Sequence, residues 1–153
     1  MKPLEGISIV LAEDDDDARE ALRLALEARG ASLRCVNDGA AALAAIRERP
    51  PDVVISDISM PGEDGHAFLK KLRALPPQRG GRTPAVALTA HGRPEDRLRT
   101  LRAGFQIHVT KPAPPHELAT VVARLGARLQ RRPSDAGGGD SYGGKGAYST
   151  EPK

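Results

Sequence analysis

Five short apolar runs recur along the chain, and each leads into a polar or turn-forming segment. The runs are rich in aliphatic and β-branched side chains, a composition that is typical of buried strands. Their length of five or six residues also suits strands better than helices. We predict strands over residues 7–12, 31–36, 53–57, 85–89 and 105–109.

The segments after these runs repeat apolar residues at the i, i+3, i+4 and i+7 spacing of a helix that buries one face. Gly30 and the Pro50-Pro51 pair end two of them, because glycine favours the position after a helix and proline cannot continue one. In the fourth segment, Leu98 and Leu101 are the large apolar anchors. The predicted helices cover about residues 18–29, 40–49, 65–75, 94–103 and 115–129, with a loop over 76–81.

Strands that alternate with helices in this way predict an α/β fold, with one doubly wound parallel sheet covered by helices on both faces. The crossover connections of such a sheet are right-handed. Ligands bind beyond the carboxyl ends of the strands, at the point where the strand order reverses. Side chains that directly follow the predicted strands are therefore the candidates for a functional site.

Composition and charge narrow the class of protein. The chain has 153 residues, of which 39% are hydrophobic and 3% aromatic, with no Trp, so we expect one domain with an aliphatic core. The single cysteine, Cys35, excludes an intrachain disulfide and favours a cytoplasmic location. No apolar run approaches the roughly 20 residues that cross a membrane. A net charge of +3 without aromatic platforms gives no reason to expect direct DNA binding.

Polar side chains at the strand ends form a candidate site, which consists of Glu13, Asp14, Asp57, Thr89 and Lys111. Three carboxylates in one crevice repel one another by roughly 4 kcal/mol per close pair at an effective dielectric near 20, so one of them takes up a proton unless a cation lies among them. Oxygen ligands without His or Cys favour Mg²⁺.

A metal ion, an ammonium and a hydroxyl that face one carboxylate form a receptor for a doubly charged group rich in oxygen, and phosphate is the natural candidate. We infer phosphoryl transfer to Asp57 as the nucleophile. A simpler interpretation, in which Asp57 only caps the following helix, stays open. Asp16 and Asp17 are interpreted as a favourable first helical turn, and the role of Asp15 is ambiguous.

An acidic pair and three short motifs follow one another in order: Glu13-Asp14, then Asp57 in Asp-x-x-Met-Pro with Gly65 eight positions on, then Thr89-Ala90 and Lys111-Pro112. This pattern resembles the receiver domain of bacterial two-component response regulators. The resemblance covers about residues 5 to 131 and implies a flavodoxin-like (βα)5 sheet with strand order 2-1-3-4-5. We expect the domain at residues 5–132, followed by a disordered Gly/Ser-rich tail over 133–153.

The resemblance implies a phosphoacceptor in a two-component or phosphorelay system, without enzymatic activity beyond its own phosphotransfer and dephosphorylation. The phosphoryl group would come from a sensor histidine kinase or a histidine phosphotransfer protein. The implied metal ligands are Glu13, Asp14, Asp57 and the backbone carbonyl of Ser59, and the implied phosphate-binding and switch residues are Thr89, Ala90 and Lys111. A cis peptide bond between Lys111 and Pro112 is also implied.

Three other positions, Ser59, His91 and His108, leave alternatives open. His108 stands where many receivers have an aromatic switch residue, in a segment more similar to the receivers of hybrid sensor kinases. It is interpreted as an exposed strand residue, with a switch, pH-sensing or partner-binding role as the alternative. Ser59 and His91 either tune the phosphoryl lifetime or are solvated loop residues. His66 and His116 are expected at the surface, near helix starts.

Basic side chains gather between residues 93 and 128, namely Arg93, Arg97, Arg99, Arg102, Arg124 and Arg128. They form one face if the last two helices are neighbours, and this face is either a solvated surface or a docking surface.

No output domain fits after Arg132, so an unknown downstream protein is expected to read the signal. A phosphorylation-dependent dimer stays open. The rival hypothesis is a receiver-like scaffold that works without phosphorylation, and a phosphatase of this fold would need an acid where Ser59 stands.

Overall fold

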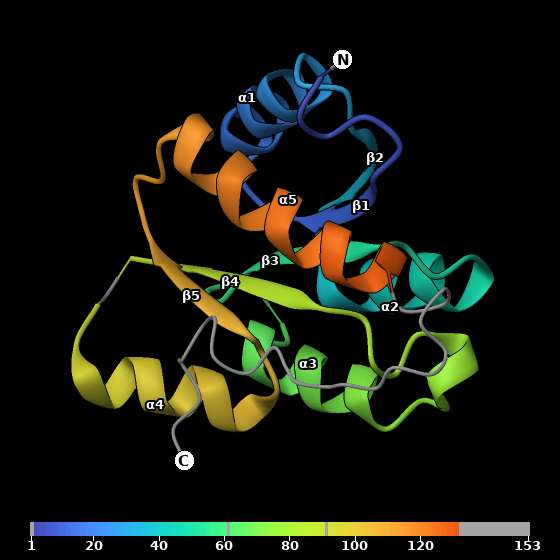
Figure 1. Cartoon of the computed structure of the whole chain (residues 1–153). Helices are drawn as coiled ribbons and strands as arrows, with labels where there is room; N and C mark the ends of the chain where they lie inside the picture. Colours follow the sequence, from blue (N-terminus) through green and yellow to red (C-terminus); the bar gives the residue numbers. More distant parts are fainter. Residues whose placement is uncertain (1, 61, 91, 132–153) are drawn as a thin grey trace.

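The computed structural model describes residues 2–60, 62–90 and 92–131, so the expected tail over 133–153 lies outside the described residues. Five parallel strands form one sheet in the order β2-β1-β3-β4-β5, which confirms the predicted fold class (Figure 1). The strands are β1 (Ser8–Ala12), β2 (Ser32–Val36), β3 (Val53–Asp57), β4 (Ala85–Thr89) and β5 (Ile107–Thr110).

Helices follow the strands in turn, and three of them begin at an aspartate. The side chains of Asp15, Asp38 and Asp64 each accept a hydrogen bond from the backbone amide three residues on, which satisfies a free amide at the helix start. Asp15 is thus the N-cap of the first helix, and Asp16 and Asp17 lie in its first turn, as interpreted from the sequence. The helices are α1 (Asp16–Glu27), α2 (Gly39–Glu48), α3 (Gly65–Arg73), α4 (Pro94–Ala103) and α5 (Pro115–Arg131).

Two hydrophobic cores cover the two faces of the sheet. α1 and α5 lie on one face, and α2, α3 and α4 lie on the other (Figure 1). Alternate residues of each central strand point to opposite cores: Ile9 and Leu11 pack under α1 and α5, and Val10 packs against the other layer. Burial on both faces explains why the central strands are continuous apolar runs.

Some predicted details of the elements were wrong. β5 begins at Ile107 rather than Phe105, because the Phe105 amide still donates to the Thr100 carbonyl in the last turn of α4. The loop predicted over 76–81 contains a short 3-10 helix, Pro77–Arg79. Leu98 does not anchor α4, since it is 37% exposed.

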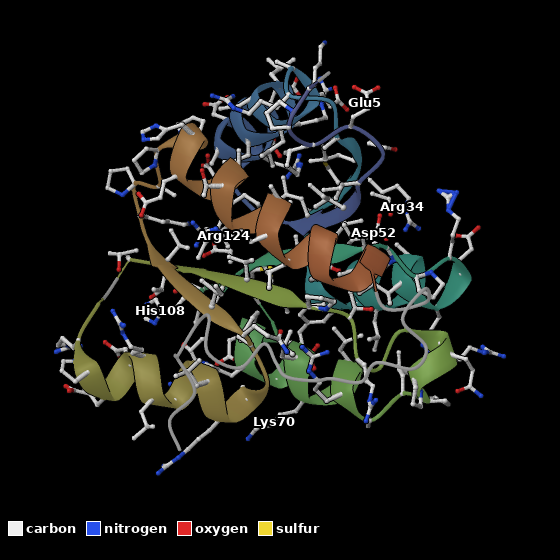
Figure 2. All side chains as sticks on the ribbon, viewed as in Figure 1. Glu5, Arg34, Asp52, Lys70, His108 and Arg124 are labelled. Carbon is white, nitrogen blue, oxygen red and sulfur yellow. The ribbon has the colours of Figure 1, made fainter. Side chains whose placement is uncertain are left out.

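The condition for one basic face, that the last two helices are neighbours, is not met. α4 and α5 cover opposite faces of the sheet, so the arginines of α4 are separated from Arg124 on α5 (Figure 2). Two of these arginines have acidic partners, because Arg93, before the start of α4, lies 3.2 Å from Asp96, and Arg99, in its middle, lies 3.7 Å from Asp64. None of the helices in the described ranges combines the length and the hydrophobicity that a membrane crossing needs.

Arg73, the last residue of α3, joins three segments that lie far apart in the sequence. Its guanidinium donates to the carbonyls of Gly81, Thr83 and Gly104, at 2.7 to 3.0 Å. Burial lowers the pKa of Arg73 to about 10, so it stays charged at neutral pH. These bonds fix the end of α4 and the segment before β4 against α3, and no motif in the sequence indicates them.

His66 is buried, contrary to the expectation of a surface residue. It is 8% exposed, and its Nε2 atom lies 3.4 Å from Oγ1 of Thr100 in α4. Its Nδ1 atom lies 3.8 Å from Oδ2 of Asp64. The prediction failed because the helix that covers this position comes from a distant part of the chain. His116, in contrast, is exposed at the start of α5, as expected.

The pKa of His66 is lowered by burial and by the nearby charge of Arg99, although Asp64 opposes this. An unfolded histidine has a pKa of about 6.5, so between that value and the lower folded pKa the unfolded chain binds more protons. We therefore expect His66 to make the free energy of unfolding fall as the pH drops below about 6.5.

Urea denaturation at a series of pH values checks this prediction. The His66→Phe variant should lose part of the decline in stability between about pH 7 and pH 5, and the control His116→Gln should keep the wild-type profile. Parallel profiles for wild type and His66→Phe would refute the assignment.

Candidate functional site

Asp57 is the last residue of β3 and lies at the carboxyl edge of the sheet, 3% exposed. The next segment leaves this edge and returns as α3, whose first residue, Gly65, donates its amide to the Ile58 carbonyl at 2.8 Å. A Cβ atom on Gly65 would lie 2.6 Å from the Asp57 carbonyl oxygen. Only glycine therefore allows α3 to begin so close to the end of β3.

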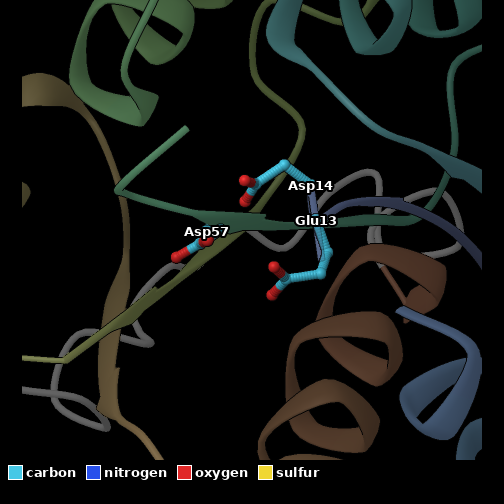
Figure 3. Close-up of side chains that lie close together, drawn as sticks. All are labelled: Glu13, Asp14 and Asp57. Carbon is cyan, nitrogen blue, oxygen red and sulfur yellow. The ribbon is translucent and has the colours of Figure 1, made fainter. Parts of the chain in front are cut away.

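Glu13 and Asp14 follow β1, the neighbour of β3 in the sheet. Glu13 is 1% exposed, and its Oε2 atom accepts a hydrogen bond from the Asp15 amide at 3.1 Å. Asp14 is exposed. Oxygen atoms of Glu13, Asp14 and Asp57 all lie within 4.8 Å of one another, around a common space (Figure 3).

Lys111 brings a positive charge to two of these carboxylates. Its Nζ atom lies 3.1 Å from Oδ1 of Asp57 and 3.4 Å from Oε1 of Glu13. The peptide bond between Lys111 and Pro112 is cis, as the resemblance implied. The Lys111 amide also donates to the Thr89 carbonyl at 2.7 Å, which ties the ends of β4 and β5 together.

The pKa shifts agree with this geometry. Burial raises the pKa of Glu13 above its usual value and the charge of Asp57 adds to this, whereas the Asp15 amide and Lys111 oppose it. Burial by itself lowers the pKa of Lys111, but the hydrogen bond and charge of Asp57, together with Glu13, raise it overall. Burial is thus the main cause of the raised pKa of Glu13, and one ammonium lies beside a cluster of three carboxylates that could hold a metal ion.

The remaining predicted residues lie at the same edge or outside the described residues. Thr89 is buried at the end of β4, and Ala90 is exposed directly after it. Ser59, two residues after Asp57, is exposed. His91 lies outside the described residues, so its expected roles stay open.

His108 lies in β5 on the side of α4 (Figure 2). The interpretation as an exposed strand residue is wrong, because His108 is only half-exposed and both ring nitrogens are shielded from solvent. Strand periodicity alone could not reveal this, since the shielding depends on the elements that flank the edge of the sheet.

The sequence also missed a contact of the β1–α1 turn. Nη1 of Arg19, in α1, donates to the Glu13 carbonyl oxygen at 2.9 Å. A bond from a helix side chain to a main-chain carbonyl leaves no trace in a motif, so only the fold could show it.

A family model described as the response regulator receiver domain matches residues 9–123. A 14.6 kDa protein of Leptolyngbya boryana is 38% identical over 122 residues, which are 80% of this chain and 92% of that protein. The transcriptional regulatory protein CseB of Streptomyces coelicolor is 37% identical over 142 residues, which are 93% of this chain but only 57% of CseB.

The chain spans about half the length of the transcriptional regulators that it matches. Among solved structures, the signal receiver domain of a signal transduction histidine kinase from Syntrophus aciditrophicus superposes with a TM-score of 0.74 at 32% identity. The match covers 82% of this chain and 94% of that domain. The similarity thus includes a receiver that belongs to a kinase, in line with the residues around His108.

Gly65→Ala should destabilise the fold by about 1–3 kcal/mol, because the new methyl group has no room against the Asp57 carbonyl oxygen. Chemical denaturation measures this loss. The control Gly62→Ala adds a methyl group where no atom lies within 4 Å, although its positive φ of +80° adds backbone strain. An equal or smaller loss in Gly65→Ala than in Gly62→Ala would contradict the close-approach argument.

Proposed function

Because the chain belongs to the response regulator receiver family, we propose that Asp57 is its phosphoacceptor and that a sensor histidine kinase or a histidine phosphotransfer protein supplies the phosphoryl group. The observation that carries the proposal is the contact of 3.1 Å between the Lys111 ammonium and the buried Asp57 carboxylate, beside two further carboxylates. A structural aspartate needs only one positive charge beside it. Here the Lys111 ammonium and a metal ion on the carboxylates would together also bind an incoming anion.

In the proposed reaction, an oxygen of Asp57 bonds to phosphorus while the bond from phosphorus to the donor imidazole nitrogen breaks, and that nitrogen keeps the electron pair. The charge of the Asp57 carboxylate is thereby replaced by the charge of the phosphoryl oxygens. Lys111 pairs with one of these oxygens and the Thr89 hydroxyl with another. Positioning and charge compensation supply most of the catalysis in such transfers.

Mg²⁺ is the metal that the donor set favours. It binds oxygen ligands at about 2.1 Å in an octahedral arrangement, so opposite ligands lie about 4.2 Å apart, slightly closer than the outer limit of 4.8 Å among the three carboxylates. Glu13, Asp14, Asp57 and the Ser59 carbonyl would hold the ion. When bound, the ion supplies positive charge against the phosphoryl oxygens.

The phosphorylated protein would act through a downstream protein. All the residues that the chemistry needs are present, which favours the phosphoacceptor over a scaffold that works without phosphorylation. Phosphorylation-dependent pairing of two copies is an alternative form of the same output.

Intact mass spectrometry after incubation with a small acyl phosphate tests the proposal. Wild-type protein should gain one phosphoryl group only with Mg²⁺ present, and Asp57→Asn should lose the adduct completely, because the amide is a far weaker nucleophile than the carboxylate.

Asp38→Asn is the matched control, since Asp38 caps α2, is not one of the three clustered carboxylates, and asparagine caps a helix equally well. This variant should be phosphorylated like wild type. Equal labelling of Asp57→Asn would exclude Asp57 as the acceptor. A folded wild-type protein that binds Mg²⁺ but takes no phosphoryl group would favour the scaffold.

A further inference from the structure

The amide, the carbonyl and both carboxylate oxygens of Glu13 each have a polar partner. Its amide donates to the Val36 carbonyl at 3.1 Å, and its two carboxylate oxygens face the Asp15 amide and Lys111. Its carbonyl oxygen accepts from Nη1 of Arg19 at 2.9 Å. This bond from Arg19 comes from a side chain outside the candidate site.

Asp14, in contrast, has no side-chain support. Among the described residues its carboxylate makes no hydrogen bond, and it is exposed. Its direction therefore depends on the backbone that carries it. The Glu13 carbonyl belongs to the same planar peptide unit as the Asp14 amide, so a bond that fixes this carbonyl fixes the start of Asp14.

Arg19 is well suited to hold that peptide unit. Its Nη2 atom lies 2.6 Å from Oδ1 of Asp16, so the two arms of the guanidinium bridge both ends of the turn from Glu13 to Asp16. The rigid fork of arginine can serve two acceptors at once, which lysine cannot do in the same geometry. The carboxylate of Asp16 also offsets part of the positive charge of the Arg19 guanidinium.

We propose that Arg19 is a positioning residue that directs the Asp14 carboxylate into the candidate metal site by holding the Glu13 carbonyl. The inference rests on the proposed function, because it treats Asp14 as a metal ligand. The positioning role and simple electrostatics predict opposite effects on cation affinity when the Arg19 side chain is removed. Removal of a positive charge near three carboxylates would strengthen cation binding, whereas loss of a positioning contact weakens it.

Isothermal titration calorimetry with Mg²⁺ alone distinguishes these outcomes. Arg19→Ala should bind Mg²⁺ about tenfold more weakly than wild type, the size typical for loss of a group that orients a ligand. Arg19→Lys should fall between the two, since it keeps the charge but not the fork. In the metal-free protein, the Asp14 amide resonance should move in Arg19→Ala.

Arg23 provides the matched control one turn further along α1. It pairs with Glu20 and Glu27 on the helix surface and makes no hydrogen bond to the β1–α1 turn among the described residues. Arg23→Ala should lose a similar amount of helix stability but keep the Mg²⁺ affinity within about twofold of wild type.

Each outcome decides a different point. Equal or tighter Mg²⁺ binding by Arg19→Ala overturns the positioning role and leaves the proposed function intact. An equal weakening in Arg23→Ala also overturns it, because the effect would then reflect helix stability alone. Absence of Mg²⁺ binding in folded wild type would refute the proposed metal site, and the inference with it.

Discussion

The site depends on one electrostatic constraint, the burial of Asp57 and Glu13 side by side at the edge of the sheet. Two carboxylates in such surroundings cannot both stay charged without nearby positive charge. Lys111 lies within 3.4 Å of both, so one ammonium faces two buried carboxylates, with the carboxylate of Asp14 close by. The residual demand for positive charge makes the cluster receptive to a metal ion, and the ion and Lys111 together make it receptive to an anion.

The fold creates this constraint because parallel strands end at the same edge. Strand order places β3 between β1 and β4, so Asp57 lies next to the turn after β1 and near the ends of β4 and β5. Large apolar side chains on both faces keep the strands in register. Gly65 then lets α3 begin against the Asp57 carbonyl, so the loop after Asp57 stays short and close to the site.

Arginine side chains that bond to main-chain carbonyls hold both edges of the sheet, Arg19 at the carboxyl edge with the candidate site and Arg73 at the amino edge. Arg19 bonds to the Glu13 carbonyl, and Arg73 bonds to those of Gly81, Thr83 and Gly104. Between α3 and α4 the buried contact of His66 with Thr100 adds a polar link at the opposite end of the interface from Arg73. Polar contacts near both ends of α3 thus join it to α4 and to the residue after α4.

The sequence by itself determined most of the elements and predicted which polar side chains lie together at the carboxyl edge of the sheet. β3, β4 and α4 occupy the predicted residues, because strand burial and helix caps are encoded in neighbouring positions. Strand order, the cis peptide bond and the approach of Lys111 to Asp57 followed from the family pattern. The tertiary structure alone decided the burial of His66, the exposure of Leu98, the separation of α4 from α5 and the contact of Arg19 with Glu13. Each of these depends on which distant segment packs against a residue, and periodicity within one segment carries no information about that partner.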